Sequence, residues 1–420
     1  MTNSDVNPNQ PLLGRQPILD VHEKLFGYRL AYTHQAVASG EDDAEVDVAT
    51  IRKRLDELRL AETFANLKGF VAADGRLLFD PADALLPAGH LVFSMGVEKA
   101  KVPGLVEGVR ALGQAGFEIC VDIDKPTELS ADEESLLDLG SYVNADIHAL
   151  EDAFLREFLR KAEQKHIPAI AGHVDTHADH ERALKLGFPF FQGHYFAEPV
   201  TAHGKTLDPS FHALVRILNL LNRDADLPEI ERIFKGEPVL TFKLLRLTNS
   251  ASIGVRVRIS SVRQAINLIG RRALSRWVQL LMFSRSPSAD DIERNPLMQL
   301  AALKGYFMER LARLCFPQQS TFPDMAFLAG LMSLVPIAVG VSMANILGQI
   351  EVAPKVQQAL LEHTGEIGVL LDLTESYDNH DQPAVINALG RLGYCIGPDE
   401  LNRTLVEAIA WVQGLAVENQ

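Results

Sequence analysis

The feature that most constrains the fold is a change of periodicity near residue 200. Before this point, short β-like runs lie at 91–93, 118–123 and 168–171. They alternate with amphipathic helical stretches near 50–60, 104–114, 152–165 and 176–186. Such alternation predicts a parallel sheet covered by helices, either open or closed into a barrel. After this point apolar residues recur only at helical spacing, so the sequence predicts an α/β domain followed by an all-α domain.

The boundary falls in the segment 198–209, where two prolines and a glycine interrupt the pattern. We predict a loose N-terminus over 1–11, a barrel-like domain over 12–200, a linker over 201–209 and a helical domain over 210–420. The first helices of the second domain are expected at 211–221, from 226, at 239–247 and at 261–283. Asp226 is the expected N-cap of the second of these, with Pro228 inside its first turn.

Charge is spread unevenly along the 420 residues. Residues 1–205 hold 20 Lys and Arg against 33 Asp and Glu, whereas residues 206–420 hold 20 against 22. The acidic first half argues against a nucleic-acid partner. The polar first ten residues do not resemble a signal peptide. Three widely spaced cysteines, Cys120, Cys315 and Cys395, are each expected to be buried thiols in a reducing cytoplasm.

One uncharged run, residues 325–350, is long enough to span a bilayer. Pro336 lies in the middle of it, and Ser and Asn side chains dilute it. A proline in this position more naturally ends one buried helix and begins another. We therefore expect core helices here and no membrane span.

Three sequence motifs in the first half resemble those of EAL domains. The run GRQPILD at 14–20 followed by GYRLA at 27–31 is similar to the family's opening "QPI-D" and "GxEAL". The run IAGHVDT at 170–176 resembles "AEGVET", and QGHYFAEP at 192–199 resembles "QGYxFxxP". The resemblance implies a TIM-like (β/α) barrel that hydrolyses cyclic-di-GMP with two divalent cations held by carboxylates at the strand ends.

The family's ligand positions can be followed one by one along this sequence. The positions that match are Arg29, Asp80, Ser94, Asp122, Ile123, Asn144, Gly172, Asp175 and Gln192. Carboxylates are missing at Arg29, Ile123 and Gly172, and Arg29 would repel a cation. The resemblance therefore implies a disarmed site, with no metal, no cofactor and no catalysis.

The second half resembles the HDOD domain, an HD-like α-helical bundle. The motifs are EPVLTFKLLRLTNSA at 237–251, ISSVRQAINLIG at 259–270 and FLAGLM at 327–332. Ser333 and Leu334 stand where HD enzymes carry a His-Asp pair, so no metal site is implied. Polar residues at 249–251 are expected to fix the loop through side-chain to backbone hydrogen bonds rather than to act in catalysis.

Two groups of residues allow both a functional and a structural interpretation. The His-rich run 173–180 suits zinc, or else a polar turn in which Asp175 or Thr176 caps a helix. Residues 238–289 lack acids but contain Lys243 and eight arginines, so they form either a surface for an anion or partner or the solvated faces of helices. The residues assigned to such a surface are Arg246, Arg256, Arg258, Arg263, Arg271, Arg272 and Arg276.

The sequence supports three hypotheses for function. The leading one is a non-enzymatic cytoplasmic regulator linked to cyclic-di-GMP, which acts through a protein partner of the HDOD domain. The others are a sensor that binds cyclic-di-GMP without cleaving it, with Arg29 as its cation, and a residually active phosphodiesterase. Homo-oligomers are expected if the acidic first half pairs with the basic segment 238–289.

Overall fold

The computed structural model describes residues 12–33, 67–72, 91–125, 129–198, 209–249, 259–283, 295–379 and 381–417. These residues divide into two compact units, one within Asn7–Glu198 and one within Pro199–Gln420. Each unit has its own buried core. The predicted strand at 118–123 has the same bounds in the structure. The predicted strand at 91–93 lies inside an observed strand, and the one predicted at 168–171 is observed one residue later.

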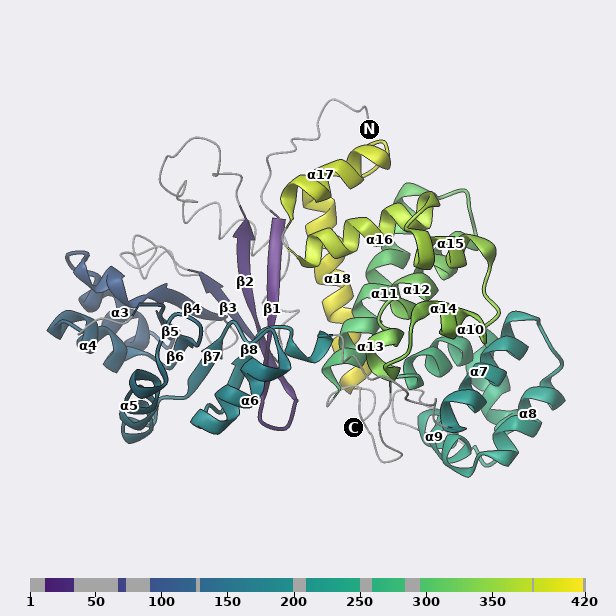
Figure 1. Cartoon of the computed structure of the whole chain (residues 1–420), viewed down its shortest axis with the longest axis horizontal. Coiled ribbons are helices and arrows are strands. Elements are labelled where there is room, and N and C mark those ends of the chain that lie inside the picture. The colour runs from purple at the N-terminus through teal and green to yellow at the C-terminus, as the bar shows by residue number, and fades with distance from the viewer. Residues whose placement is uncertain are drawn as a thin grey trace. The chain divides into compact units, whose positions relative to one another are not determined.

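The first unit is a closed barrel of eight strands (Figure 1). The strands are β1 Leu12–Asp20, β2 Leu25–Thr33, β3 Lys68–Ala72, β4 Leu91–Gly96, β5 Glu118–Ile123, β6 Tyr142–Asp146, β7 Ala169–Gly172 and β8 Phe190–Gln192. Strand β1 runs antiparallel to both β2 and β8, and every other neighbouring pair is parallel. The predicted alternation therefore closes into a barrel.

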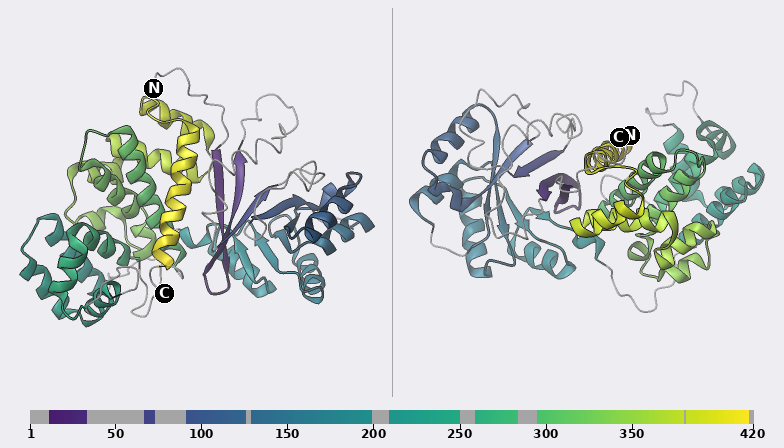
Figure 2. Two further views of the ribbon diagram at one scale, coloured as in Figure 1. Left: turned by 180° about the vertical axis from the view of Figure 1, so that it is seen from behind. Right: turned by 90° about the horizontal axis from the view of Figure 1, so that it is seen from above.

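Between β4 and β8, short helices connect the parallel strands and lie outside them (Figure 2). They are the 3-10 turn η2 Val97–Lys101 and the helices α3 Leu105–Gln114, α4 Ala131–Leu139, α5 Asp152–Gln164 and α6 His177–Leu186, with the turn η3 Tyr195–Ala197 after β8. Thr176 caps α6, since its hydroxyl accepts from the Asp179 amide at 3.1 Å and the Asp179 carboxylate accepts from the Thr176 amide. The predicted capping role of Thr176 is confirmed.

Inward-facing side chains fill the barrel in layers. The apolar layer consists of Ile18, Phe70, Val92, Cys120, Tyr142 and Ile170, with Phe26 and Phe190 packed against it. Side chains alternate between the two faces of a strand, so residues two positions further along the parallel strands form the next layer toward their carboxyl ends. That next layer is polar, and it is the candidate site.

The second unit is all-helical, as predicted. Its helices are α7 Pro209–Asn222, α8 Leu227–Gly236, α9 Pro238–Thr248, α10 Val262–Leu281, α11 Pro296–Cys315, α12 Phe322–Met332, α13 Val335–Val339, α14 Met343–Leu347, α15 Pro354–Glu362, α16 Gly365–Asp378, α17 Gln382–Arg391 and α18 Pro398–Val417. Asp226 is the N-cap residue of α8 and Pro228 lies in its first turn, as predicted, although the Asp226 side chain makes no capping hydrogen bond.

The apolar run of the sequence forms the centre of this unit. An 18-residue window, Phe322–Val339, is apolar enough to cross a membrane, and 56% of it is buried inside the domain. It is divided into α12 and α13, with Pro336 in the first turn of α13, as the sequence predicted. Close approach of α11 explains Gly330, because a Cβ there would lie 2.8 Å from both the Lys304 carbonyl oxygen and the Met308 sulfur.

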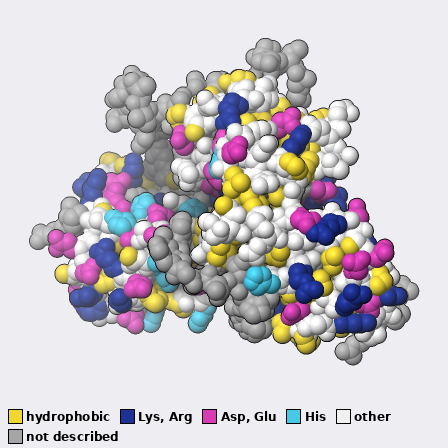
Figure 3. Space-filling view, turned by 45° about the vertical axis from the view of Figure 1, so that its right-hand side comes forward, with side chains coloured by type: hydrophobic (Ala, Val, Ile, Leu, Met, Phe, Trp, Pro, Cys, Tyr) yellow, Lys and Arg dark blue, Asp and Glu magenta, His cyan; other side chains and the backbone are white. Residues whose placement is uncertain are grey.

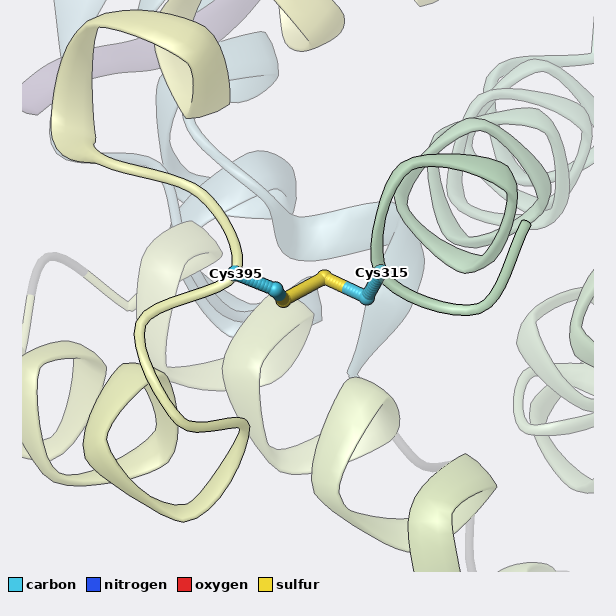
Figure 4. The surroundings of a disulfide bond; sticks show 2 residues. All are labelled: Cys315 and Cys395. Carbon is cyan, nitrogen blue, oxygen red and sulfur yellow. A yellow bond between two sulfur atoms is a disulfide. The ribbon is translucent and has the colours of Figure 1, made fainter. Parts of the chain in front are cut away.

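A disulfide joins Cys315, at the end of α11, to Cys395 in the segment between α17 and α18 (Figure 4). The prediction of buried thiols is therefore wrong for these two cysteines and correct for Cys120, which is buried and unpaired. The pair is separated by 80 residues in the sequence, so only the packing of the helices brings the two sulfurs together. The cytoplasmic location stays a prediction.

Candidate functional site at the barrel mouth

The polar layer consists of six polar residues and one glycine, which line the inside of the barrel at the carboxyl ends of its parallel strands. They are Gln16 of β1, Arg29 of β2, Ser94 of β4, Asp122 of β5, Asn144 of β6, Gly172 of β7 and Gln192 of β8. Six of these seven positions were assigned to a site from the sequence. Gln16 was not, although it lies in the first quoted motif and is paired in register with Arg29.

Arg29 forms a two-pronged ion pair across the barrel interior. Its Nη1 donates to Asp122 Oδ1 at 2.8 Å and its Nη2 donates to Asp122 Oδ2 at 2.6 Å. Strands β2 and β5 are not neighbours, so this pair spans the lumen rather than one strand gap. Burial alone would lower the pKa of Arg29, but the hydrogen bonds and charge of Asp122 outweigh it and raise that pKa further above its ordinary value.

A chain of amides forms the other side of the layer. Asn144 Nδ2 donates to Gln192 Oε1 at 2.8 Å, and Gln192 Nε2 donates to Gln16 Oε1 at 2.6 Å. The remaining acceptor, Asn144 Oδ1, is buried without a hydrogen-bond partner. A Cβ on Gly172 would lie only 2.7 Å from this oxygen, so Gly172 leaves the space that Asn144 occupies.

A second group of polar residues follows β6 and β7 at the same end of the barrel. His173 Nδ1 lies 3.0 Å from Asp146 Oδ2, and Asp146 Oδ1 accepts from the His148 amide at 2.8 Å. His148 Nε2 lies 3.1 Å from the His173 carbonyl oxygen. The sequence did not indicate His148, because nothing local shows that residues 148 and 173 lie side by side.

The His-rich run does not gather around one point. His173 faces Asp146, the His177 amide donates to Glu198, and His180 stacks on Tyr195 with ring centroids 4.0 Å apart. Asp175 accepts from the His194 amide at 3.0 Å. Within the described ranges, no three His, Cys, Asp or Glu side chains form a group that could hold a metal ion.

The described residues of the polar layer do not fit the divalent cations that the family resemblance implies. Hard cations require several oxygen ligands. Here Asp122 faces a guanidinium, and Ile123 lies on the other face of β5, with 1% of its side chain exposed. Asp80 lies outside the described residues. We therefore derive no chemical step through a metal.

The arginines assigned to a basic surface are largely paired with carboxylates or carbonyls of other helices. Arg263 bonds Glu231 at 2.9 Å, and Arg271 donates to the Ala225 carbonyl oxygen. Arg272 and Arg276 both bond Asp324 and the buried Glu309. Arg246 is exposed on α9, while Arg256 and Arg258 lie outside the described residues. Basic and acidic side chains also lie interspersed on the face drawn in Figure 3.

The loop after α9 is held as the sequence predicted. Asn249 Nδ2 donates to the Ile259 carbonyl oxygen at 2.8 Å, and the Ile259 amide donates back to Asn249 Oδ1 at 2.8 Å. Asn249 therefore joins the two ends of the segment 250–258, which itself lies outside the described residues. This confirms the structural role predicted for Asn249.

Comparison with known protein families identifies the helical half. Residues 207–367 match the family described as the HDOD domain. The chain is 26% identical over 409 residues to the cyclic di-GMP phosphodiesterase CdgJ of Vibrio cholerae. This alignment covers 96% of the chain and 92% of CdgJ. The chain is also 23% identical over 411 residues to the uncharacterised protein YuxH of Bacillus subtilis, in an alignment that covers 96% of the chain and 98% of YuxH.

Several solved structures resemble the barrel half. A standalone EAL protein from Vibrio cholerae, solved with c-di-GMP, shares 18% identity at a TM-score of 0.37, over 46% of this chain and 92% of its own. The phosphodiesterase PaMucR, in a c-di-GMP complex, shares 17% identity at a TM-score of 0.35, over 44% of this chain and 89% of its own.

These comparisons correct one prediction. The sequence led us to expect no enzyme, but a relative aligned along 96% of the chain is named a phosphodiesterase. The chain thus combines a closed eight-stranded barrel with a helical half in which residues 207–367 match the HDOD domain, and its motifs resemble those of EAL–HDOD tandem proteins.

Proposed function

We propose that the barrel binds cyclic-di-GMP at its polar mouth. The observation that carries this proposal is the similarity to CdgJ along 96% of the chain. The chemistry of the mouth supports it. Cyclic-di-GMP presents two phosphates and two guanines, and guanidinium groups and side-chain amides are suitable partners for both. Arg29 and the amides of Gln16, Asn144 and Gln192 lie in one layer there.

Calorimetric titration of the full chain with cyclic-di-GMP tests this proposal. We expect saturable heat with cyclic-di-GMP and none with GMP at the same concentration, because only the cyclic dinucleotide fills a mouth built from several strands. No heat with cyclic-di-GMP, in the presence or absence of Mg²⁺ and Mn²⁺, would contradict the proposal.

Hydrolysis of cyclic-di-GMP is a second candidate function, favoured by the name of CdgJ. The residues that suit proton transfer are His173 and Asp146, whose ring nitrogen and carboxylate oxygen lie 3.0 Å apart, with 54% of the His173 side chain exposed. A base at this position would take a proton from water as the water oxygen bonds to phosphorus and the ester P–O3′ bond breaks. The protonated imidazole would then return the proton to the leaving oxygen.

Chromatography of the titrated samples tests this second candidate. Appearance of the linear dinucleotide would establish cleavage, and His173→Ala would then lower the rate about 100-fold or more while binding is kept. Intact ligand after long incubation with either cation would reject hydrolysis and leave binding as the function of the barrel.

We further propose that the HDOD domain passes the signal to a protein partner, one form of which is a second copy of the chain. Support comes from two exposed apolar side chains one turn apart on α9, Val239 at 46% and Phe242 at 65% exposure. Light scattering tests the self-association form. A measured mass well above the 46.2 kDa of one chain, together with a lower mass for the variant Phe242→Asp, would support self-association. A measured mass equal to that of one chain would contradict it.

A further inference from the structure

We propose that Arg29 takes the place of a divalent cation in this barrel: its guanidinium binds a ligand phosphate, and Asp122 is the residue that positions it. This inference rests on the proposed binding of cyclic-di-GMP and names the group that neutralises the ligand. It follows from the disagreement between the cation site that the family resemblance implies and the residues that line this mouth.

The Arg29 guanidinium has N–H groups that remain available to a ligand after it has bonded to Asp122. A guanidinium has five N–H groups, and the bonds of Nη1 and Nη2 to the two Asp122 oxygens use two of them. The planar fork of the remaining donors matches a phosphate oxyanion. The Arg29 side chain is 22% exposed, so part of it is accessible to solvent.

The surroundings hold Arg29 in its charged form and in one orientation. Asp122 grips it at 2.8 and 2.6 Å, which fixes the plane of the guanidinium. The neighbouring Cys120 stays a neutral thiol, because burial and the charge of Asp122 raise its pKa well above the usual range. Cys120 therefore adds no second anion that would repel a phosphate.

A second observation points to a ligand in the same layer. Asn144 is 7% exposed, and its Oδ1 is buried without a hydrogen-bond partner. With Nδ2 donating to Gln192, the oxygen is the end of the amide that has no partner. An unpaired buried acceptor is unfavourable, so it suits an N–H or O–H donor of a bound nucleotide. Such a donor would complement the phosphate contact at Arg29.

The experiment is calorimetric titration of the full chain with cyclic-di-GMP, in EDTA and in Mg²⁺. We expect the two affinities to agree within about twofold, because no cation takes part. Arg29→Ala is expected to weaken binding roughly 10- to 100-fold, as the loss of a charged hydrogen bond predicts. The matched control is Arg160→Ala, which removes an exposed guanidinium from α5 of the same unit and should leave the affinity unchanged.

Arg29→Ala leaves Asp122 without its partner, so two further variants keep the test decisive if that protein does not fold. Arg29→Lys retains the charge but not the fork, and should bind about tenfold more weakly than the original chain. The double variant Arg29→Gln, Asp122→Asn keeps a neutral hydrogen bond and should bind as weakly as Arg29→Ala.

The outcomes separate this inference from the proposed function. Binding that requires Mg²⁺, or that persists unchanged in all three Arg29 variants, would overturn the role of Arg29 and leave the binding function in place. No heat from the original chain in either buffer would overturn the binding function, and the role of Arg29 with it.

Discussion

At the scale of single residues, Gly172 and Asn144 compete for one space inside the barrel. A Cβ at position 172 would lie 2.7 Å from Asn144 Oδ1, and Asn144 is held in place by Gln192. Gly172→Ala should therefore destabilise the barrel by about 1–3 kcal/mol, the usual cost of overpacking. Urea unfolding of the variant measures this cost.

Two controls isolate that contact. Gly113→Ala in α3 places its Cβ in open space, so it should be neutral or stabilising. The double variant Gly172→Ala, Asn144→Ala should lose less stability than the sum of the single variants, because the clash disappears with the amide. Additive losses would show that the two side chains do not interact.

His180 gives the barrel a defined sensitivity to acid. Its ring lies between Tyr195, at a 4.0 Å centroid distance, and Phe191, at 4.6 Å. Burial lowers the pKa of His180 below its ordinary value of 6.5, although the charge of Glu23 opposes this. The unfolded chain then binds the proton more readily, so stability is complete above pH 6.5 and decreases as the pH falls toward the folded pKa.

The variant His180→Phe keeps the ring stack and removes the proton site. Unfolding free energies measured between pH 7.5 and 5 should fall less steeply in this variant than in the original chain. Because the other histidines are common to both proteins, the difference between the two curves reports His180 alone. Parallel curves would contradict the assignment.

At the scale of helices and strands, the disulfide constrains the helical unit by joining two distant segments of the chain. Cys315 and Cys395 close a loop of 80 residues that contains α12 to α17. Loop-closure entropy predicts a contribution of roughly 4–5 kcal/mol for a loop of this length. Cys395→Ser should therefore lower the midpoint of thermal unfolding of the helical unit under non-reducing conditions.

Reduction provides the control for that prediction. The double variant Cys315→Ser, Cys395→Ser should lose no more stability than the single variant. Dithiothreitol should destabilise the original chain by a similar amount and leave both variants unchanged. A single variant as stable as the original chain would show that the bond does not form in solution.

The sequence was informative where an element depends on its neighbours along the chain. Strand β5 and helices α3, α5 and α6 were predicted within a residue or two, because periodicity and capping residues are local signals. Closure of the barrel was implied by the family resemblance alone, and the direction of β1 could not be predicted, since both depend on pairing between residues as far apart as Ile18 and Gln192.

The same distinction applies to the candidate site. Arg29 and Asp122 were both singled out, but they are 93 residues apart and nothing local indicates that one grips the other. The carboxylates that pair with the arginines of α10 come from α8, α11 and α12, so the acid-free stretch in the sequence did not reveal them.

At the scale of the whole molecule, two separate cores predict two separate unfolding events. The units within Asn7–Glu198 and Pro199–Gln420 each bury their own apolar side chains. Calorimetry of the full chain should resolve two transitions. Gly172→Ala should shift only the transition of the barrel, and Cys395→Ser only that of the helical unit. A single transition that both variants shift together would show that the units unfold as one.

The antiparallel seam between β1 and β8 also has a consequence for biosynthesis. Ile18 of β1 pairs with Gln192 of β8, so the barrel cannot close until β8, its last strand, has been synthesised. A ribosome adding about 5–20 residues per second needs roughly 10–35 seconds to cover that interval. Throughout that time β1 presents an unpaired edge to other nascent chains, and such edges are where aggregation begins. The yield of folded protein should therefore depend on how fast the first 200 residues are translated.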